Sequence, residues 1–309
     1  MTKIGTDPEF MLEKDGKIYS AIPILNKKKK INYSSFYHDN VLAECTVKPS
    51  SNKEEFLNNI KESLFNFSKI VHPYKLISKS AHYYDKSELI SEKSFEISCD
   101  AEKCVYDLKV IHQDEQILRS TNLRTAGGHI HIGDNILKDK YKSLSCVKMM
   151  DLFVGFTSIY LDKNKDAVVR KTLFGKAGRF RDKNYGIEYR SLSNFWLNNP
   201  YYAAFIFDLS CFVVDFIKSN KDEELWSVDI SKIENPNSWH DLSFNEKDCY
   251  QCKGYDLPLL IECINNHKKC KKIYNFIKNI LPANLFDRYE NLINNKFSDD
   301  LMYNWNICC

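Results

Sequence analysis

Arginine, glycine and proline are scarce in this chain of 309 residues. Its 10 Gly and 8 Pro are too few for a collagen-like or linker-like sequence, and 43% hydrophobic with 28% charged residues exclude an intrinsically disordered chain. A strong excess of one charge is also missing, because 44 basic and 41 acidic residues leave a formal net charge of +3. Nucleic-acid-binding proteins carry a larger basic excess. We therefore expect a globular protein with no nucleic-acid partner.

The first residues lack the apolar stretch of a secretory signal peptide. We expect a cytoplasmic protein whose 11 cysteines are reduced thiols. The most apolar window, 201–217, contains Asp208 and Asp215. An aspartate costs roughly 2.5–3.5 kcal/mol at the centre of a bilayer. This window therefore predicts a buried core helix, and no membrane partner is expected.

The few arginines are concentrated in one part of the chain. Six of the seven lie between Arg119 and Arg190, together with seven of the ten glycines. The planar guanidinium group can bind a carboxylate or phosphate through two parallel hydrogen bonds, which lysine cannot do. The clustering indicates an anionic ligand in this stretch.

Hydrophobic periodicity predicts a mixture of strands and helices. Strands are expected at 3–12, 17–22, 41–47, 127–133 and 185–192, with weaker candidates at 95–97 and 105–111. Helices are expected from a capping-box pattern at 51–54 to about 71, and at about 143–161, 201–218, 256–267, 269–280 and 283–295. Because strands and helices do not alternate regularly, the pattern favours an α+β fold over a doubly wound sheet. We expect a catalytic core over 1–200, with a concave antiparallel sheet, and a helical region over 201–309 packed on it.

Four short segments place polar side chains at strand spacing. They contain Asp7 and Glu9, Glu44, His129 and His131, and Glu188 with Arg190. Carboxylates with one or two imidazoles suit Mg²⁺ or Mn²⁺, since hard divalent ions prefer oxygen ligands. Each segment alone is equally well explained as a solvent-facing strand or a structural histidine pair. Their occurrence together predicts a metal site.

Residues 170–196 read as a basic, glycine-bearing loop that leads into a strand. In such a loop Lys176, Arg179 and Arg181 can surround a triphosphate while Arg190 meets the transferred phosphoryl group. A solvated basic turn is the alternative. Walker-type and Rossmann-type glycine motifs are absent, which excludes both standard nucleotide-binding folds.

Several of these motifs together resemble a known family. They are Gly5–Phe10, Asp39-Asn40-Val41 with Glu44, Gly127–Gly133, Phe174–Gly178, and Tyr185–Trp196. In this order they are similar to the phage-type carboxylate-amine ligases, amidoligases of the glutamine synthetase and glutamate-cysteine ligase superfamily. The resemblance covers roughly residues 1–200, and its last block is the most specific.

The resemblance implies a glutamine synthetase-like antiparallel sheet that forms an ATP-binding funnel with divalent ions at its waist. It implies metal-binding roles for Glu9, Glu44 and Glu188, and less firmly for Asp7. His129 or His131 would lie on the metal or phosphate side, and Arg190, Glu188 and His131 would be catalytic. The cations expected near the nucleotide by position are Arg170, Lys176, Arg179 and Arg181.

The expected function is ATP-dependent joining of a carboxylate to an amine through an acyl phosphate. One alternative is a binding protein that keeps the fold without turnover. Another is a metal-dependent hydrolase that uses His129 and His131. The two substrates stay open among amino acids, peptides, cell-wall fragments and protein termini, and so does the oligomeric state.

A second metal site is conceivable at Cys249, Cys252, His267 and Cys270, whose spacing is compatible with tetrahedral Zn²⁺. The intervening sequence reads as a regular apolar helix. With so many cysteines in the chain, unrelated core thiols are the better interpretation.

Overall fold

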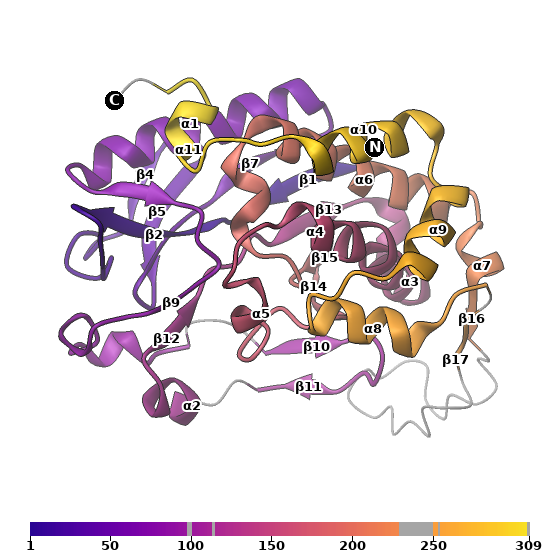
Figure 1. Ribbon diagram of the computed structural model, residues 1–309, viewed down its shortest axis with the longest axis horizontal. Coiled ribbons are helices and arrows are strands. Elements are labelled where there is room, and N and C mark those ends of the chain that lie inside the picture. The colour runs from indigo at the N-terminus through magenta and orange to yellow at the C-terminus, as the bar shows by residue number, and fades with distance from the viewer. Residues whose placement is uncertain (98–100, 113–114, 229–249, 253, 308–309) are drawn as a thin grey trace.

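The computed structural model describes residues 1–97, 101–112, 115–228, 250–252 and 254–307. The fold is α+β (Figure 1). Its strands form antiparallel sheets, and most of its long helices lie on the outside of these sheets. This confirms the α+β class that the sequence predicts, and the glutamine synthetase-like funnel stays a prediction.

The larger sheet has seven strands, all paired antiparallel, in the order β11-β10-β14-β15-β13-β1-β7. In that order the strands are β11 (Val110–Ile111), β10 (Glu102–Cys104), β14 (Arg179–Lys183), β15 (Gly186–Tyr189), β13 (Ile130–Gly133), β1 (Lys3–Thr6) and β7 (Val47–Ser50). On β13, Ile130 and Ile132 join the hydrophobic core, whereas His131 lies on the opposite face. That opposite face carries the polar residues of interest.

A second sheet adjoins the first where the chain passes through Asp7 and Pro8. Its strands are β3 (Lys17–Tyr19), β2 (Glu9–Lys14), β6 (Leu42–Cys45), β5 (Ser34–Asp39) and β4 (Lys29–Ile31), and β8 (Lys75–Ile77) also pairs with β2. Two small pairs complete the strands: β9 (Ala81–Tyr83) with β12 (Leu123–Thr125), and β16 (Trp226–Val228) with β17 (Tyr250–Cys252).

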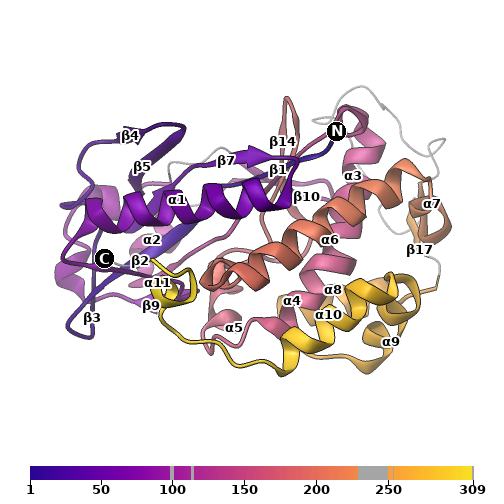
Figure 2. The ribbon, with the colours of Figure 1, turned by 90° about the horizontal axis from the view of Figure 1, so that it is seen from above.

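Long helices cover the nonpolar face of the seven-stranded sheet. Helix α1 (Lys53–Val71) contacts β7, and α6 (Pro200–Lys218) contacts β1 and α1 (Figure 2). Asn52 begins α1 by accepting a hydrogen bond from the Glu55 backbone N–H. The helix then buries Phe56, Ile60 and Leu64 at helical spacing, which is why the sequence predicted it correctly.

The other helices are α2 (Glu115–Ser120), α3 (Lys140–Met150), α4 (Phe156–Leu161), α5 (Ala167–Arg170), α7 (Asp222–Leu225), α8 (Leu257–Asn265), α9 (Lys271–Ile280), α10 (Ala283–Asn294) and α11 (Leu301–Asn304). Most of them, all except α2 and α5, contribute residues to the hydrophobic core or pack against it. A π-helical turn, Asp151–Gly155, joins α3 to α4. One hydrophobic cluster contains residues from both 1–200 and 201–309, and the division of the chain into these two regions stays a prediction.

Some predicted elements differ from the structure. The strand expected at 3–12 is interrupted at Pro8, which has no N–H to donate to a ladder. The segment 95–97 is not a strand, because a 3₁₀ turn at Glu92–Ser94 ends at Phe95. In the weak candidate at 105–111, only its last two residues form a strand. The stretch of 170–196 read as a basic loop includes strand β14, in which three cations share one face and Phe180 is buried on the other.

Two helical segments, Lys140–Leu161 and Pro200–Lys218, are long and apolar enough to span a bilayer. However, 94% and 61% of their most apolar windows are buried inside the protein. Core helices pass the same length and composition test, so this is weak evidence for membrane insertion.

Candidate active site

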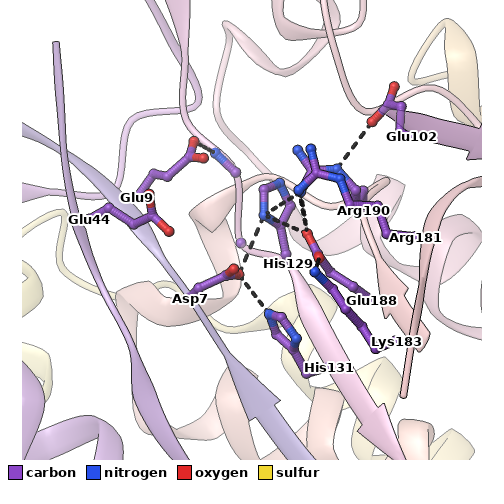
Figure 3. A network of polar contacts seen from close by, with 12 residues as sticks. Asp7, Glu9, Glu44, Glu102, His129, His131, Arg181, Lys183, Glu188 and Arg190 are labelled. Carbon is purple, nitrogen blue, oxygen red and sulfur yellow. Dashed lines mark hydrogen bonds and ion pairs between the residues drawn. The ribbon is translucent and has the colours of Figure 1, made fainter. Parts of the chain in front are cut away.

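The predicted acids and histidines gather where the two sheets meet (Figure 3). Strand register explains this, because β13 pairs His131 with both Gly5 of β1 and Glu188 of β15. Strand β2 pairs Glu9 with Glu44 of β6. Asp7 and Glu9, on either side of Pro8, therefore connect the two groups of side chains.

The first group consists of Asp7, His129 and Glu188, whose ligand atoms lie within 4.8 Å of one another. The Asp7 Oδ1 atom is 3.4 Å from His129 Nδ1 and 3.0 Å from His131 Nε2. Burial opposes ionisation of Asp7, but the charges and hydrogen bonds of the two histidines outweigh it and hold the pKa of Asp7 well below its ordinary value. Asp7 is therefore ionised at neutral pH.

The second group, here called the acidic trio, consists of Glu9, Asp39 and Glu44, again with ligand atoms within 4.8 Å. Glu9 accepts a hydrogen bond from the Gly127 N–H at 2.6 Å, and Glu44 accepts one from the Tyr37 hydroxyl at 2.7 Å. Burial raises the pKa of Glu9. Burial, followed by the charges of Asp7, Asp39 and Glu9, raises the pKa of Glu44 well above its ordinary value.

Asp39 was missed as a candidate ligand, although it belongs to the Asp39-Asn40-Val41 motif. A tight turn at Asn40, with φ of 54°, joins β5 to β6 and sets Tyr37 opposite Glu44. Since Asp39 is two residues from Tyr37, it shares that face of the sheet. A hairpin at Asn40 was the signal available in the sequence.

Glu188 has a different electrostatic environment from the acidic trio. Its carboxylate forms ion pairs with Arg181 at 3.3 Å, with Lys183 at 2.9 Å and with Arg190. Burial alone would raise the pKa of Glu188, but Arg190 and then His129 lower it to about 2. Among the described residues, by contrast, no Lys or Arg side chain forms an ion pair with Glu9 or Glu44. The site thus has a negative side and a positive side.

Glu102 is an acid that pairs with the arginines of the positive side, and the sequence analysis did not predict its place in the site. Its carboxylate lies 3.1 Å from Arg190 Nε and 3.7 Å from Arg179 Nη1. It stands on the three-residue strand β10, which is too short to show periodicity. Only pairing with β14 places it in the site.

The four cations predicted near a nucleotide occupy different positions. Arg179 and Arg181 lie on the polar face of β14, and Lys176 is exposed on the preceding turn. Arg170 is buried, and it donates to the carbonyl oxygens of Ala126 at 2.9 Å and Ser191 at 3.2 Å. These bonds commit much of the Arg170 side chain to the protein backbone, and nucleotide binding by the four cations stays a prediction.

Two of these arginines have spare donors. Within the described part of the chain, the buried atoms Arg181 Nε, Arg181 Nη2 and Arg179 Nη1 have no hydrogen-bond partner. Buried donors are almost always satisfied in proteins, so an external acceptor is the simplest partner for them. An anion beside β14 meets this need.

The residues present fit a hard divalent cation. The acidic trio offers carboxylate oxygens from three neighbouring strands, β2, β6 and β5, and carboxylate oxygen is the ligand type of Mg²⁺ and Mn²⁺. A cation there would offset both the burial and the mutual repulsion that raise the pKa of Glu44. Asp7, His129 and Glu188 form the other candidate set, although Glu188 already has three cationic partners.

The second metal site considered from the sequence falls partly outside the described residues, which leave out Cys249 and the side chain of Cys252. His267 has its Nε2 atom 3.0 Å from the carbonyl oxygen of Asp162. Cys270 is a free, partly buried thiol.

Comparison with known proteins bears on the positive side of the site. No curated protein matches the chain. Residues 121–233 match the family model described as phage phiEco32-like COOH.NH2 ligase-type 2. This segment contains both histidines, strand β14, Glu188 and Arg190. The match confirms, over residues 121–233, the resemblance to the phage-type carboxylate-amine ligases that the motifs predicted.

Proposed function

We propose that the protein is an ATP-dependent carboxylate-amine ligase that works through an acyl phosphate on a glutamine synthetase-like sheet. The observation that carries this proposal is the division of charge across one sheet face. A group of buried carboxylates lies beside buried guanidinium groups with unused donors. ATP-dependent ligation requires both a divalent cation and a grip on phosphate oxygens.

On the negative side, Glu9, Asp39 and Glu44 would hold Mg²⁺ or Mn²⁺, with Asp7 beside them. The bound ion would supply positive charge to the phosphates of ATP. Glu9 and Glu44 are fixed by the Gly127 N–H and the Tyr37 hydroxyl, so their oxygens are oriented before the ion binds.

On the positive side, Arg190 and Arg181 would bind the oxygens of the γ-phosphate. Glu188 and Glu102 hold the guanidinium group of Arg190 from two sides, which fixes its orientation in the site. Donors fixed in advance stabilise a transition state more strongly than mobile ones, because no reorganisation is needed during the reaction.

The chemistry proceeds in two steps. An oxygen of the substrate carboxylate forms a bond to the γ-phosphorus while the bond to the bridging β–γ oxygen breaks, and ADP leaves. The amine nitrogen then attacks the acyl carbon and loses a proton to solvent, and phosphate departs with one oxygen of the former carboxylate. The products are an amide, ADP and inorganic phosphate.

Hydroxylamine tests this proposal without knowledge of the natural amine. The protein is incubated with ATP, Mg²⁺, hydroxylamine and pools of amino acids, peptides and simple carboxylic acids. A ligase of this kind forms a hydroxamate and an equal amount of ADP from at least one pool, whereas Arg190→Ala forms neither. ADP release that is the same with and without a carboxylate would argue against a ligase.

A further inference from the structure

An apolar recess opens beside the positive side of the site. It is a cavity of about 120 Å³ between α2, β11 and the segment that follows α5. Its apolar walls are formed by Ile111, Ile117, Leu118, Leu173 and Phe174. The ligation chemistry described above uses none of these residues.

The recess continues into the active site. Glu102, Leu118 and Phe174 line both the recess and the neighbouring cavity, which reaches Glu9, His129 and Arg190. Glu102 stands at the boundary, where it pairs with Arg190 on one side and Arg179 on the other. A ligand can therefore have one end at Arg190 and the other in the recess.

The charge around the recess favours an anionic ligand. Two cations, Lys176 and Arg179, and one acid, Glu102, line it. Arg179 Nη1 lies 3.7 Å from the Glu102 carboxylate, too far for a hydrogen bond, and has no hydrogen-bond partner within the described part of the chain. An apolar wall with cations at its border matches a molecule that carries an apolar group next to a carboxylate or phosphate.

Two such molecules take part in the proposed reaction, namely ATP and the carboxylate substrate. The apolar walls are aliphatic except for Phe174, and His112 is the one other ring among the described residues that line the recess. The other end of β14 instead has Lys183 and, at the turn, Tyr185, a residue that is 40% exposed and whose ring lies beside His131. Exposed aromatic rings are suited to stacking on a purine. With the purine of ATP at the Tyr185 end of β14, the Arg179 end of the strand is free to bind the carboxylate substrate.

We infer that the recess binds the apolar side chain of the carboxylate substrate, whose carboxylate lies towards Arg190. The inference rests on the proposed function, because it assigns the substrate end of that same site. It specifies the substrate class as a carboxylic acid with an aliphatic or aromatic group of a few carbons, and it disfavours small or purely polar acids.

A chain-length series tests the inference through binding alone. Acetate, butyrate, hexanoate and 3-phenylpropanoate are titrated by NMR into the protein with Mg²⁺ and a non-hydrolysable ATP analogue. Burial of each added methylene in the recess strengthens binding about fourfold. The expected result is a steady increase in affinity from acetate to hexanoate.

Two Ile→Glu variants, one inside the recess and one outside it, test whether the chain-length dependence arises in the recess. Ile117→Glu places a carboxylate on the recess wall, where the side chain is already 51% exposed, so the fold tolerates it. Ile90→Glu is the control, since Ile90 is 79% exposed and lies outside the recess. The hexanoate-to-acetate affinity ratio should fall at least tenfold in Ile117→Glu and stay at the parent value in Ile90→Glu.

Other outcomes separate this inference from the proposed function. Equal affinity for all chain lengths, or an Ile117→Glu ratio like the parent's, overturns the recess assignment. If Ile117→Glu no longer binds the ATP analogue but binds the acids with unchanged affinities, the recess holds the adenine base. That result also overturns the recess assignment. Chain-length-dependent binding without any hydroxamate formation supports the recess and contradicts the ligase.

Discussion

At the scale of single residues, the buried carboxylates differ in what balances their charge. Burial, and then the charges of neighbouring acids, raise the pKa of Glu44, whereas neighbouring cations outweigh burial at Glu188 and lower its pKa to about 2. The same substitution of Glu by Gln should therefore have opposite effects on stability at the two positions.

Glu44→Gln should weaken Mn²⁺ or Mg²⁺ binding at least tenfold, because the amide keeps the shape but not the charge that attracts the ion. Without metal, its stability should equal or exceed that of the parent at neutral pH, since the repulsion among the trio is relieved. Calorimetric metal titration and urea unfolding measure both quantities. Glu54→Gln, on the exposed side of α1, is the control that should change neither. Parental metal affinity in Glu44→Gln would remove the acidic trio as the cation site.

Glu188→Gln should instead lower the free energy of unfolding by about 3 kcal/mol or more, because it leaves buried cations without their partner. The folded-state pKa of Glu188 lies below the ordinary value of 4.5, so its contribution is present above about pH 4.5 and is lost as the pH falls towards 2. Urea unfolding at pH 7 and pH 3 checks this. The parent and the variant should differ less at pH 3, and an equal difference at both pH values would contradict the assignment.

Arg190→Lys should lose nearly as much ligase activity as Arg190→Ala. A lysine carries the charge but cannot contact Glu102, Glu188 and a phosphate oxygen at once from a planar group. Hydroxamate formation with the acid identified by screening is the measurement. Near-parental turnover in Arg190→Lys would show that only the charge at this position matters.

At the scale of elements, the turn after α5 depends on a close fit between a glycine and an arginine. Gly175 has a φ of +74°, and a Cβ atom there would lie 1.6 Å from Arg170 Nη1. Arg170 in turn connects the segment before His129 to the segment after Arg190 through two carbonyl oxygens. The turn therefore supports strands on both sides of the site.

Gly175→Ala should destabilise the protein by about 2 kcal/mol more than Gly16→Ala. Gly16 has a similar φ of +77°, but its Cβ would meet no atom within 4 Å, so this control isolates the backbone cost from the clash with Arg170. Urea unfolding compares the two variants. Similar losses of stability would mean that the Arg170 contact is unimportant.

The elements also show how far the sequence could predict the structure. Helices such as α1 were predicted because their buried residues repeat at helical spacing over many turns. Strand β14 was read as a loop because its cations alternate with polar and aromatic residues instead of a continuous apolar series. Glu102 was missed because pairing of the short strand β10 with β14 brings it into the site, and no local pattern records this pairing. Asp39, by contrast, could have been found from the hairpin at Asn40 that pairs β5 with β6.

At the scale of the whole molecule, the site depends on two sheets that meet at Asp7 and Pro8. The family match covers the strands that carry the cations and histidines, over residues 121–233. The acidic trio lies outside that segment, on β2, β5 and β6. The proposed ligase therefore needs both sheets, one for the cation and one for the phosphate.

The measurement that tests this account most directly is the fate of the carboxylate oxygen. A carboxylate is a poor electrophile, so amide formation requires its conversion to a mixed anhydride. One carboxylate oxygen then leaves with phosphate or with AMP, depending on which anhydride was formed. With the acid found by hydroxylamine trapping labelled in both oxygens with ¹⁸O, the account predicts ADP and inorganic phosphate carrying one heavy oxygen, with none released by Arg190→Ala. Heavy oxygen in AMP, or amide formed with no label in any phosphate, would contradict it.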